Sequence, residues 1–387
     1  MSLARRLLIV LPAFAGNGVT RYVLDLANEL TGLDCSVTLF SIRPVDLGEI
    51  PHDVSLSVPV ISGGVYASRR YLYRWPIAAA RLVRAARRSD MVVAAWDTGY
   101  PLLGALLAGR VARRPVIAQV ASYPTADFGE YLGAREAKAT LWCYPRLDKA
   151  VCAADGLIDE VQSMGVAHDR AITIAWGIDV ERTQALGAEE PPEWLPQGRF
   201  VSAVGRLAKD KGFDILIEAH ARVREELPHS LVIVGQGEEQ QKLEELIDRL
   251  GVSDTVLMPG FLTNPLSVVS RSDALCAPSR HEGWGLMIAE ALALGTPVIA
   301  TDLAGPANVL AGGRYGEMVE PDSVDAFAEA LARHLREPEP LRQAATEARN
   351  NSHAYSVRAG AAKYLELCDE LNRNGRLNQP LLTTSST

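Results

Sequence analysis

The run Pro278 to Leu294, PSRHEGWGLMIAEALAL, holds the residues of this chain that are best suited to chemistry. It follows the apolar stretch Ala274 to Ala277 and passes through two glycines into a helical pattern. Gly283 and Gly285 let the backbone approach a ligand closely. The free amides and positive dipole end of a helix that begins near Gly285 favour an anion. We therefore expect a phosphate-type group at this turn.

Two carboxylates and two cations complete the predicted site. Glu282 lies in the loop and Glu290 in the following helix, where carboxylates suit sugar hydroxyls better than phosphate. The run Val204 to Gly212, VGRLAKDKG, also follows a strand pattern and supplies Arg206 and Lys211, which can neutralise a diphosphate. Ligands of open α/β sheets bind beyond the carboxyl ends of the strands, so we expect both runs to face one crevice.

The elements that must position these residues follow from the alternation of β-rich and helical stretches. This alternation predicts an α/β protein with two Rossmann-like β/α/β domains, and a length of 387 residues fits two domains. Six strands are expected in each half: 7–11, 37–40, 91–95, 116–120, 150–153 and 171–175, then 200–204, 231–235, 255–258, 274–277, 297–300 and 316–319.

Domain boundaries are expected where the periodic patterns stop. We assign residues 1–185 to the first domain and 200–356 to the second, with 186–199 as a linker because it carries three prolines and no consistent period. The helical pattern of residues 357–371 predicts a terminal helix, which we expect to pack back toward the first domain. The polar, aperiodic tail 372–387 is expected to be mobile.

The first helix of the chain has a clear apolar stripe. Gly16 and Gly18 lie in the loop that enters this helix, where they make a tight turn or approach a ligand. The stripe has helical spacing and predicts one buried face: Val19, Val23, Leu26 and Leu30.

Composition narrows the class of function and the compartment. The net charge of −8 argues against general nucleic-acid binding, so no nucleic-acid partner is expected. The five cysteines are scattered without a C-x-x-C pair, which indicates neither a disulfide framework nor a zinc site. No apolar run approaches the ~18 residues of a membrane span, and no secretory leader is evident. A cytoplasmic protein is expected.

One segment of the first half is strongly basic. Residues 1–185 hold 20 basic and 18 acidic residues, against 19 and 29 in the remainder, and the stretch Arg69 to Arg88 contains no acid. Arg81, Arg84 and Arg88 share a predicted helix face. Such a face either binds anionic lipid, at about 1 kcal/mol per arginine, on the inner face of the membrane, or is solvated or covered by a partner.

Several of these runs together resemble those of a known family. S-R-H-E-G-W-G-L, Glu290 eight residues after Glu282, G-T-P-V-I-A-T at 295–301 and G-R-L…K-G at 205–212 are similar to the family 4 retaining glycosyltransferases, the "glycosyl transferases group 1". Gly16-Asn17-Gly18, Gly177-Ile178-Asp179 and Gly260 agree with that pattern. The resemblance covers nearly the whole chain and implies the GT-B fold, in which two Rossmann-like domains face each other across a cleft.

The resemblance also implies roles for individual residues. Arg206 and Lys211 would hold the diphosphate of a nucleotide-sugar donor, Glu290 the ribose hydroxyls, and Glu282 would lie near the donor sugar. The loop of Gly16 and Gly18 would lie over the donor phosphate and the acceptor. Backbone amides would complete the contacts to sugar and phosphate: Gly283, Trp284, Gly285 and Leu286.

The reaction implied is transfer from a UDP or GDP sugar to a hydroxyl of a lipid-linked glycan or small metabolite, with retention of the anomeric configuration. No metal and no cofactor are expected, because Arg206, Lys211 and the helix terminus supply the positive charge.

Some features depart from the family pattern. No histidine lies between residues 53 and 167, where the family often has one that contacts the donor sugar; Ser122, Tyr123 or Asp127 would replace it. Trp176 stands where a small polar residue is usual, and we expect it, like Trp284, to be a packing residue.

Two other functions share the architecture, namely a sugar-nucleotide epimerase and a non-catalytic protein that binds nucleotide sugars.

Overall fold

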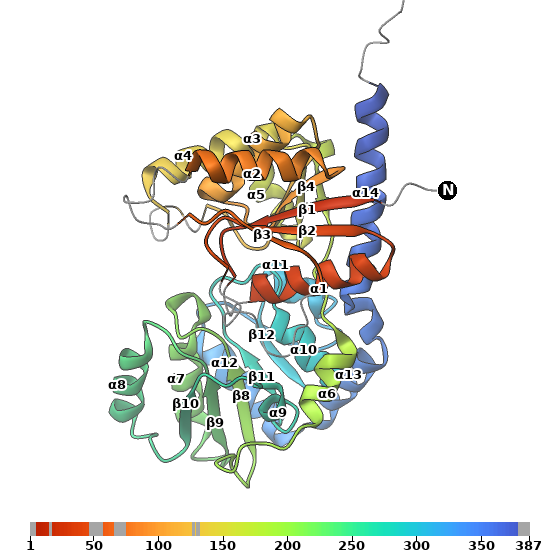
Figure 1. Cartoon of the computed structure of the whole chain (residues 1–387). Helices are drawn as coiled ribbons and strands as arrows, with labels where there is room; N and C mark the ends of the chain where they lie inside the picture. Colours follow the sequence, from red (N-terminus) through yellow and green to blue (C-terminus); the bar gives the residue numbers. More distant parts are fainter. Residues whose placement is uncertain are drawn as a thin grey trace, which may run out of the picture. The chain divides into compact units, whose positions relative to one another are not determined.

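Two compact units make up the chain in the computed structural model (Figure 1). The structure describes residues 5–14, 18–45, 57–65, 75–125, 128 and 132–377. The first unit contains residues 1–153, 157–174 and 357–387, and the second contains residues 154–156 and 175–356.

A parallel sheet of seven strands forms the centre of the first unit, in the order β3-β2-β1-β4-β5-β6-β7. Most of its strands are nearly continuous buried runs, as is usual where helices cover both faces of a parallel sheet. The strands are β1 (Arg6–Leu11), β2 (Ser36–Ser41), β3 (Val60–Ser62), β4 (Met91–Ala94), β5 (Val116–Val120), β6 (Lys149–Cys152) and β7 (Ala171–Thr173).

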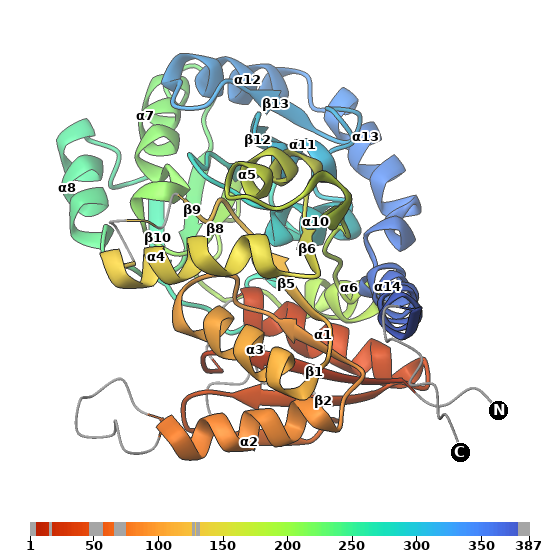
Figure 2. The ribbon, with the colours of Figure 1, turned by 90° about the horizontal axis from the view of Figure 1, so that it is seen from above.

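Helices cover the two faces of this sheet differently. The strand order runs outward from β1 in one direction to β3 and in the other to β7, and right-handed connections therefore place the two sets of helices on opposite faces. On one face α1 (Gly18–Gly32) packs against α14 (Val357–Leu377). On the other, α2 (Trp75–Arg87), α3 (Gly99–Ala112) and α4 (Ala134–Cys143) lie side by side (Figures 1 and 2). The short α5 (Ile158–Ser163) contacts β7.

The sequence patterns predicted most of the first unit. The helix with the buried stripe is α1, where Val23, Leu26 and Leu30 are buried. The expectation of six strands was wrong by one, because β3 adds a seventh at the sheet edge. Its three residues are half-buried and follow Pro59, so the strand shows neither an apolar run nor a clear alternation.

Six parallel strands form the sheet of the second unit, in the order β10-β9-β8-β11-β12-β13. All six predicted strands are present; β8 has the predicted ends, and the ends of the other five differ by at most two residues. They are β8 (Phe200–Val204), β9 (Ser230–Val234), β10 (Val256–Gly260), β11 (Leu275–Ala277), β12 (Val298–Thr301) and β13 (Glu317–Val319).

Most helices of the second unit connect these strands, while one helix precedes the first strand and two helices follow the last. Those between β8 and β10 and the long helix after β13 enclose a core that includes Leu216, Leu231, Ile233 and Phe327. The helices are α6 (Val180–Ala188), α7 (Phe213–Val223), α8 (Gln240–Leu250), α9 (Leu266–Val269), α10 (Leu286–Leu294), α11 (Ala304–Val309), α12 (Val324–Arg336) and α13 (Glu339–Asn350).

The compact units differ from the expected domain boundaries near residue 185 and at the short segment 154–156. Helix α6 belongs to the second unit, so the expected boundary at 185 and the start of the expected linker at 186 fall inside it. Asp179 caps this helix by accepting from the Arg182 amide at 2.9 Å, and Gly187 packs closely on Leu294. Helix α14 continues beyond 371 to Leu377, and residues 378–387 lie outside the described part.

A buried pair of histidines links α7 to β9 in the second unit, which the sequence did not predict. The Nδ1 atom of His220 lies 2.9 Å from Nε2 of His229, whose own Nδ1 lies 2.7 Å from the Leu227 carbonyl oxygen. A carbonyl accepts but cannot donate, so His229 carries its proton on Nδ1 and accepts from His220. The Nε2 atom of His220 then accepts from the Thr255 hydroxyl at 2.9 Å. Both rings are neutral in this arrangement.

We predict that this pair makes the protein sensitive to acid. Burial lowers the pKa of His220 to about 3 and that of His229 below its ordinary value. An unfolded histidine titrates near ~6.5, so the unfolded chain binds more protons below that pH and the free energy of unfolding decreases as the pH falls. For His220 the loss approaches about 1.4 kcal/mol per pH unit between these two pKa values.

Urea unfolding at pH 7 and pH 5 measures this dependence. His220→Gln should show a smaller decrease between the two pH values than the parent. His353→Gln, at an exposed position, serves as the control and should follow the parent. An equal decrease in His220→Gln and the parent would show that the histidine pair does not cause the acid sensitivity.

Candidate functional site

Two loops that leave neighbouring strands meet at one edge of the second sheet. Strand β8 leads into residues 205–212 and β11 leads into residues 278–285, and Leu275 of β11 pairs with Ser202 of β8. Because parallel strands have their carboxyl ends at the same edge, both loops emerge side by side. The two runs singled out in the sequence therefore lie together in the second unit.

Arg280 joins the two loops through its main chain and its side chain. The amides of Arg280 and His281 both donate to the Asp210 carbonyl, at 2.7 and 3.3 Å. The Arg280 guanidinium donates two bonds of 2.8 Å to Asp214 at the start of α7, and further bonds to the Lys209 carbonyl and to Asp322. These contacts raise the pKa of Arg280, mainly through the hydrogen bonds to Asp214. The fork of a guanidinium thus fixes one loop on the other.

A glycine allows this close approach. Gly212 ends the first loop with φ of +66°, and a Cβ atom placed there would lie 2.1 Å from the Pro278 carbonyl oxygen. Any other residue at this position would push the loops apart.

Lys211 and Glu282 form a direct ion pair across the two loops. The Nζ atom of Lys211 donates to Oε2 of Glu282 at 2.7 Å, and both side chains are about three quarters buried. Burial alone would lower the pKa of Lys211, but the charge of Glu282 and the hydrogen bond to it reverse this effect and leave that pKa raised. Lys211 is therefore a permanent cation at the centre of the loop pair.

Arg206 brings a second cation to the same place. Its guanidinium donates to Glu238 at 2.9 Å and to Asp210 at 3.2 Å, while the other carboxylate oxygen of Asp210 lies 3.9 Å from Lys211. Both cations thus flank Asp210. The Arg206 side chain is about half exposed, so an anion in solution can reach it.

The turn at residues 283–286 presents a helix start without a side-chain cap. Gly285 adopts φ of +93° directly before α10 and, as a glycine at the N-cap position, supplies no side-chain cap to the first amides of this helix. Gly305 of α11 packs on the preceding peptide, since a Cβ atom there would lie 2.6 to 2.7 Å from atoms of Gly283 and Trp284. The backbone is held tightly at a helix start, where amides and the helix dipole favour an anion.

The remaining predicted residues of the second unit lie within α10 or the core. Glu290 is in the middle of α10 with 4% of its surface exposed. Leu286 is the first residue of this helix and is half-buried. The Trp284 and Trp176 side chains are buried, in agreement with the expectation that they are packing residues.

Sequence reasoning missed several residues that shape the site. Asp210 and Arg280 were not predicted, although both lie inside the runs that were singled out. Two glycines after β9 also support the Arg206 loop, because a Cβ on Gly235 would lie 1.8 Å from the Gly205 oxygen and one on Gly237 2.3 Å from the Leu207 oxygen. The V-G-Q-G sequence at a strand end was the available signal.

The predicted residues of the first unit are described only in part. Gly16 and Asp127 lie outside the described residues, whereas Gly18 is the first residue of α1. Ser122 is exposed after β5. Next to it, burial and the nearby Glu160 raise the pKa of Tyr123. Ser122 and Tyr123 thus belong to the first unit, whereas the two loops belong to the second.

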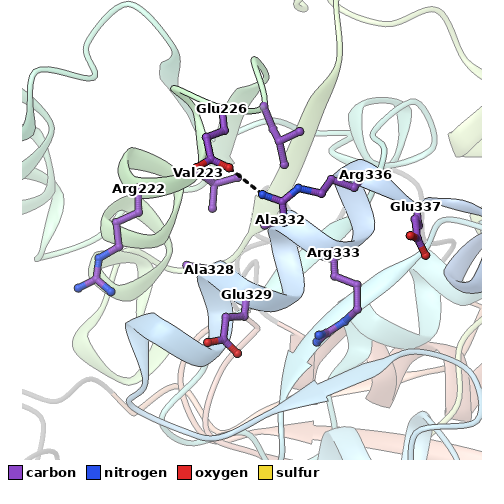
Figure 3. A pocket seen from close by; sticks show the side chains of 10 residues that line it. Arg222, Val223, Glu226, Ala328, Glu329, Ala332, Arg333, Arg336 and Glu337 are labelled. Carbon is purple, nitrogen blue, oxygen red and sulfur yellow. Dashed lines mark hydrogen bonds and ion pairs between the residues drawn. The ribbon is translucent and has the colours of Figure 1, made fainter.

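A hollow of about 630 Å³ in the second unit lies elsewhere (Figure 3). It lies between the last turns of α7 and α12. Helices in parallel α/β sheets end at the sheet edge opposite the carboxyl ends of the strands, so this hollow lies at the other edge from the two loops. Arg336 pairs with Glu226 across it, as Figure 3 shows, and Arg222 pairs with Asp325. Its charges are matched, and none of the loop residues lines it.

Two family models match successive parts of the chain. "Glycosyltransferase Family 4" matches residues 16–182 and "Glycosyl transferases group 1" matches residues 189–351. The chain belongs to the family 4 glycosyltransferases. Its two Rossmann-like units are those of the GT-B fold, as the sequence resemblance implied.

Curated relatives of this family share part of the chain. An N-acetylgalactosaminyltransferase of Campylobacter jejuni that acts on a diphospho-undecaprenol substrate is 28% identical over 227 residues, which is 57% of this chain and 61% of the relative. The D-inositol 3-phosphate glycosyltransferase of Corynebacterium urealyticum is 30% identical over 57% of this chain and 56% of the relative. The chain thus matches somewhat more than half the length of each.

Solved structures resemble the chain over almost its full length. The Anabaena protein HepE in complex with UDP and glucose has a TM-score of 0.77 and 19% identity, and the match covers 95% of this chain and 100% of that one. WaaG, a glycosyltransferase of lipopolysaccharide biosynthesis, has a TM-score of 0.71 and 18% identity, with 95% and 99% covered. At this identity the similarity shows the fold alone.

The described residues contain neither a cluster of metal ligands nor a helix that could span a membrane. No three histidine, cysteine, aspartate or glutamate side chains gather there in a way that could hold a metal ion. In the same part of the chain, every helix is too short or too polar to cross a membrane.

We predict that Arg280 positions the two loops and stabilises the second unit. Arg280→Lys keeps the charge but cannot form the two parallel bonds to Asp214, so the free energy of unfolding should fall by about 1–2 kcal/mol. Urea unfolding measures the change. Arg249→Lys, at an exposed position of α8, is the matched control. If Arg280→Lys and Arg249→Lys were equally stable, the clamp would have no structural role.

Proposed function

We propose that the protein is a retaining glycosyltransferase that moves a sugar from a UDP or GDP sugar to a hydroxyl group. The observation that carries this proposal is the convergence of Arg206, Lys211 and the open start of α10 on one pair of loops. Two cations and a helix start together match the charge of a diphosphate.

In the proposed reaction these groups act on the charge that develops as the sugar departs. The bond between the anomeric carbon and the diphosphate oxygen breaks, and a bond to the acceptor oxygen forms on the same face of the sugar. The acceptor proton passes to the departing diphosphate. Lys211 and Arg206 stabilise the growing negative charge on that diphosphate more strongly than they stabilise the intact donor, which is the source of the rate gain.

The carboxylates have a separate part in this proposal. Glu282 would accept a hydrogen bond from the donor sugar and Glu290 from the ribose, where a carboxylate recognises hydroxyl groups. In the ligand-free site Glu282 also neutralises Lys211. A diphosphate that binds Lys211 therefore replaces a carboxylate already in place, so the cation is not left without a partner before the donor arrives.

The comparisons support the substrate classes of this proposal. HepE was solved with UDP and UDP-glucose, and relatives act on a lipid-linked diphosphate glycan and on inositol phosphate. A UDP sugar as donor, and a lipid-linked glycan or small metabolite as acceptor, agree with these, and a GDP sugar is the alternative donor of this proposal. We propose that no metal ion or cofactor takes part, since the two cations can balance the diphosphate, and that the protein acts in the cytoplasm.

We predict opposite effects of two substitutions on donor binding. Glu282→Gln removes the carboxylate that competes for Lys211, so UDP should bind as tightly as in the parent or more tightly, while sugar transfer decreases. Lys211→Met removes a diphosphate contact and should weaken both UDP binding and sugar transfer, with a loss of about 10²-fold or more in rate.

A third substitution tests the proposed ribose contact. Glu290→Ala should weaken nucleotide binding without disturbing Lys211.

Thermal unfolding with and without nucleotide measures binding, since a ligand at about 100 times its dissociation constant adds about 2.7 kcal/mol to the folded state. Labelled donor with candidate acceptors measures transfer, and the product should retain its anomeric configuration with EDTA present. Glu245→Ala, exposed on α8, is the control. Unaltered nucleotide binding in both Lys211→Met and Glu290→Ala would reject the site, and an epimer formed without acceptor would assign an isomerase instead.

A further inference from the structure

Helix α3 of the first unit is apolar on the side that faces away from the sheet. Its sequence, GYPLLGALLAGRVA, buries Leu102, Ala105 and Leu106 in the core. Its other side is also apolar, with Leu107 and Val111 48% and 59% exposed. A helix that is apolar all round is normally enclosed on every side. We therefore expect the exposed side of α3 to contact a partly apolar partner or phase instead of water.

The two neighbouring helices extend this apolar surface. Helices α2 and α4 flank α3 in the layer that Figures 1 and 2 show. The described part of the chain has ten large exposed apolar side chains, and seven of them lie on these three helices, which makes a cluster rather than a scatter. They are Trp75, Ile77, Tyr100, Leu107, Val111, Leu141 and Trp142.

Positive charge surrounds the cluster. Residues 75–88, 99–114 and 134–146 contain ten basic residues and one acidic residue, Glu136. Among the described residues no carboxylate pairs with Arg84 or Arg87, and the Arg146 guanidinium stacks 4.2 Å from the centre of the Trp142 ring. The basic residues are Arg81, Arg84, Arg87, Arg88, Arg110, Arg113, Arg114, Arg135, Lys138 and Arg146.

We propose that the outer face of α2, α3 and α4 docks on an anionic lipid bilayer. Aromatic and aliphatic side chains would enter the headgroup region while the arginines around them contact lipid phosphates, the combination typical of surfaces that bind at membrane interfaces. A second copy of the chain fits poorly, because two such faces would bring like charges together. The proposal enlarges the membrane contact expected for Arg69 to Arg88, of which residues 66–74 lie outside the described part.

Lipid docking also gives the proposed transferase access to a lipid-linked acceptor. In that respect the inference rests on the proposed function, but vesicle binding needs neither donor nor activity. The two proposals can therefore fail separately.

Co-sedimentation of the full chain with vesicles tests the face. Vesicles of phosphatidylcholine and phosphatidylglycerol at 3:1 should bind the protein, and vesicles of phosphatidylcholine alone should bind it at least tenfold less. Leu107→Glu with Val111→Glu should reduce binding by about tenfold or more, as should Arg84→Gln with Arg87→Gln. The single substitutions Leu250→Glu and Arg249→Gln make changes of the same kind at exposed positions of α8, and both variants should bind like the parent.

Circular dichroism melting of each variant shows whether it is folded, independently of the donor site. Absence of binding to the anionic vesicles by the folded parent would overturn the proposal. So would equal binding by the Leu107→Glu, Val111→Glu variant and its Leu250→Glu control. A parent dimer in solution that this variant abolishes, without vesicle binding, would assign the face to a second copy, and capture by an acidic protein alone would assign it to a protein partner.

Discussion

The hydrogen bonds of Arg280 hold together the loops on which the candidate site depends. Its main chain binds the Asp210 carbonyl and its guanidinium binds Asp214, so the loop after β11 cannot move without the loop after β8. Lys211 and Glu282 lie on these two loops and reach each other because of this junction. A parallel sheet provides the starting condition, since it sends both loops out at one edge.

The ligand-free site is electrically balanced. Arg206 contacts Glu238 and Asp210, and Lys211 contacts Glu282, so each cation already has a carboxylate partner. Such a site avoids the cost of an unpaired charge in a half-buried place. A diphosphate with its sugar can exchange with these partners, because it brings negative charge for the cations and hydroxyl groups for the released carboxylates. The same residues thus serve stability without donor and recognition with it.

The two units use their surfaces differently. In the second unit the hollow between α7 and α12 is lined by cations that are matched by carboxylates, which is what a solvated surface needs. In the first unit, α2, α3 and α4 combine apolar side chains with arginines that have few acidic neighbours. The exposed apolar side chains are unfavourable in water. Beside an anionic, partly apolar phase they can be buried, and the arginines around them are attracted to its negative charge.

The sequence by itself determined the fold class, all but one of the strands, and the runs that hold Arg206, Lys211, Glu282 and Glu290. These follow from local patterns, because parallel strands are short apolar runs and a glycine-broken strand-to-helix turn has few uses. Only the tertiary structure decided which side chains pair. The Arg280 clamp joins residues 66 positions apart, and spacing along the chain does not encode such a contact. The His220–His229 pair and the exposed side of α3 involve residues close in sequence, but which side chains meet or stay exposed depends on how the surrounding elements pack.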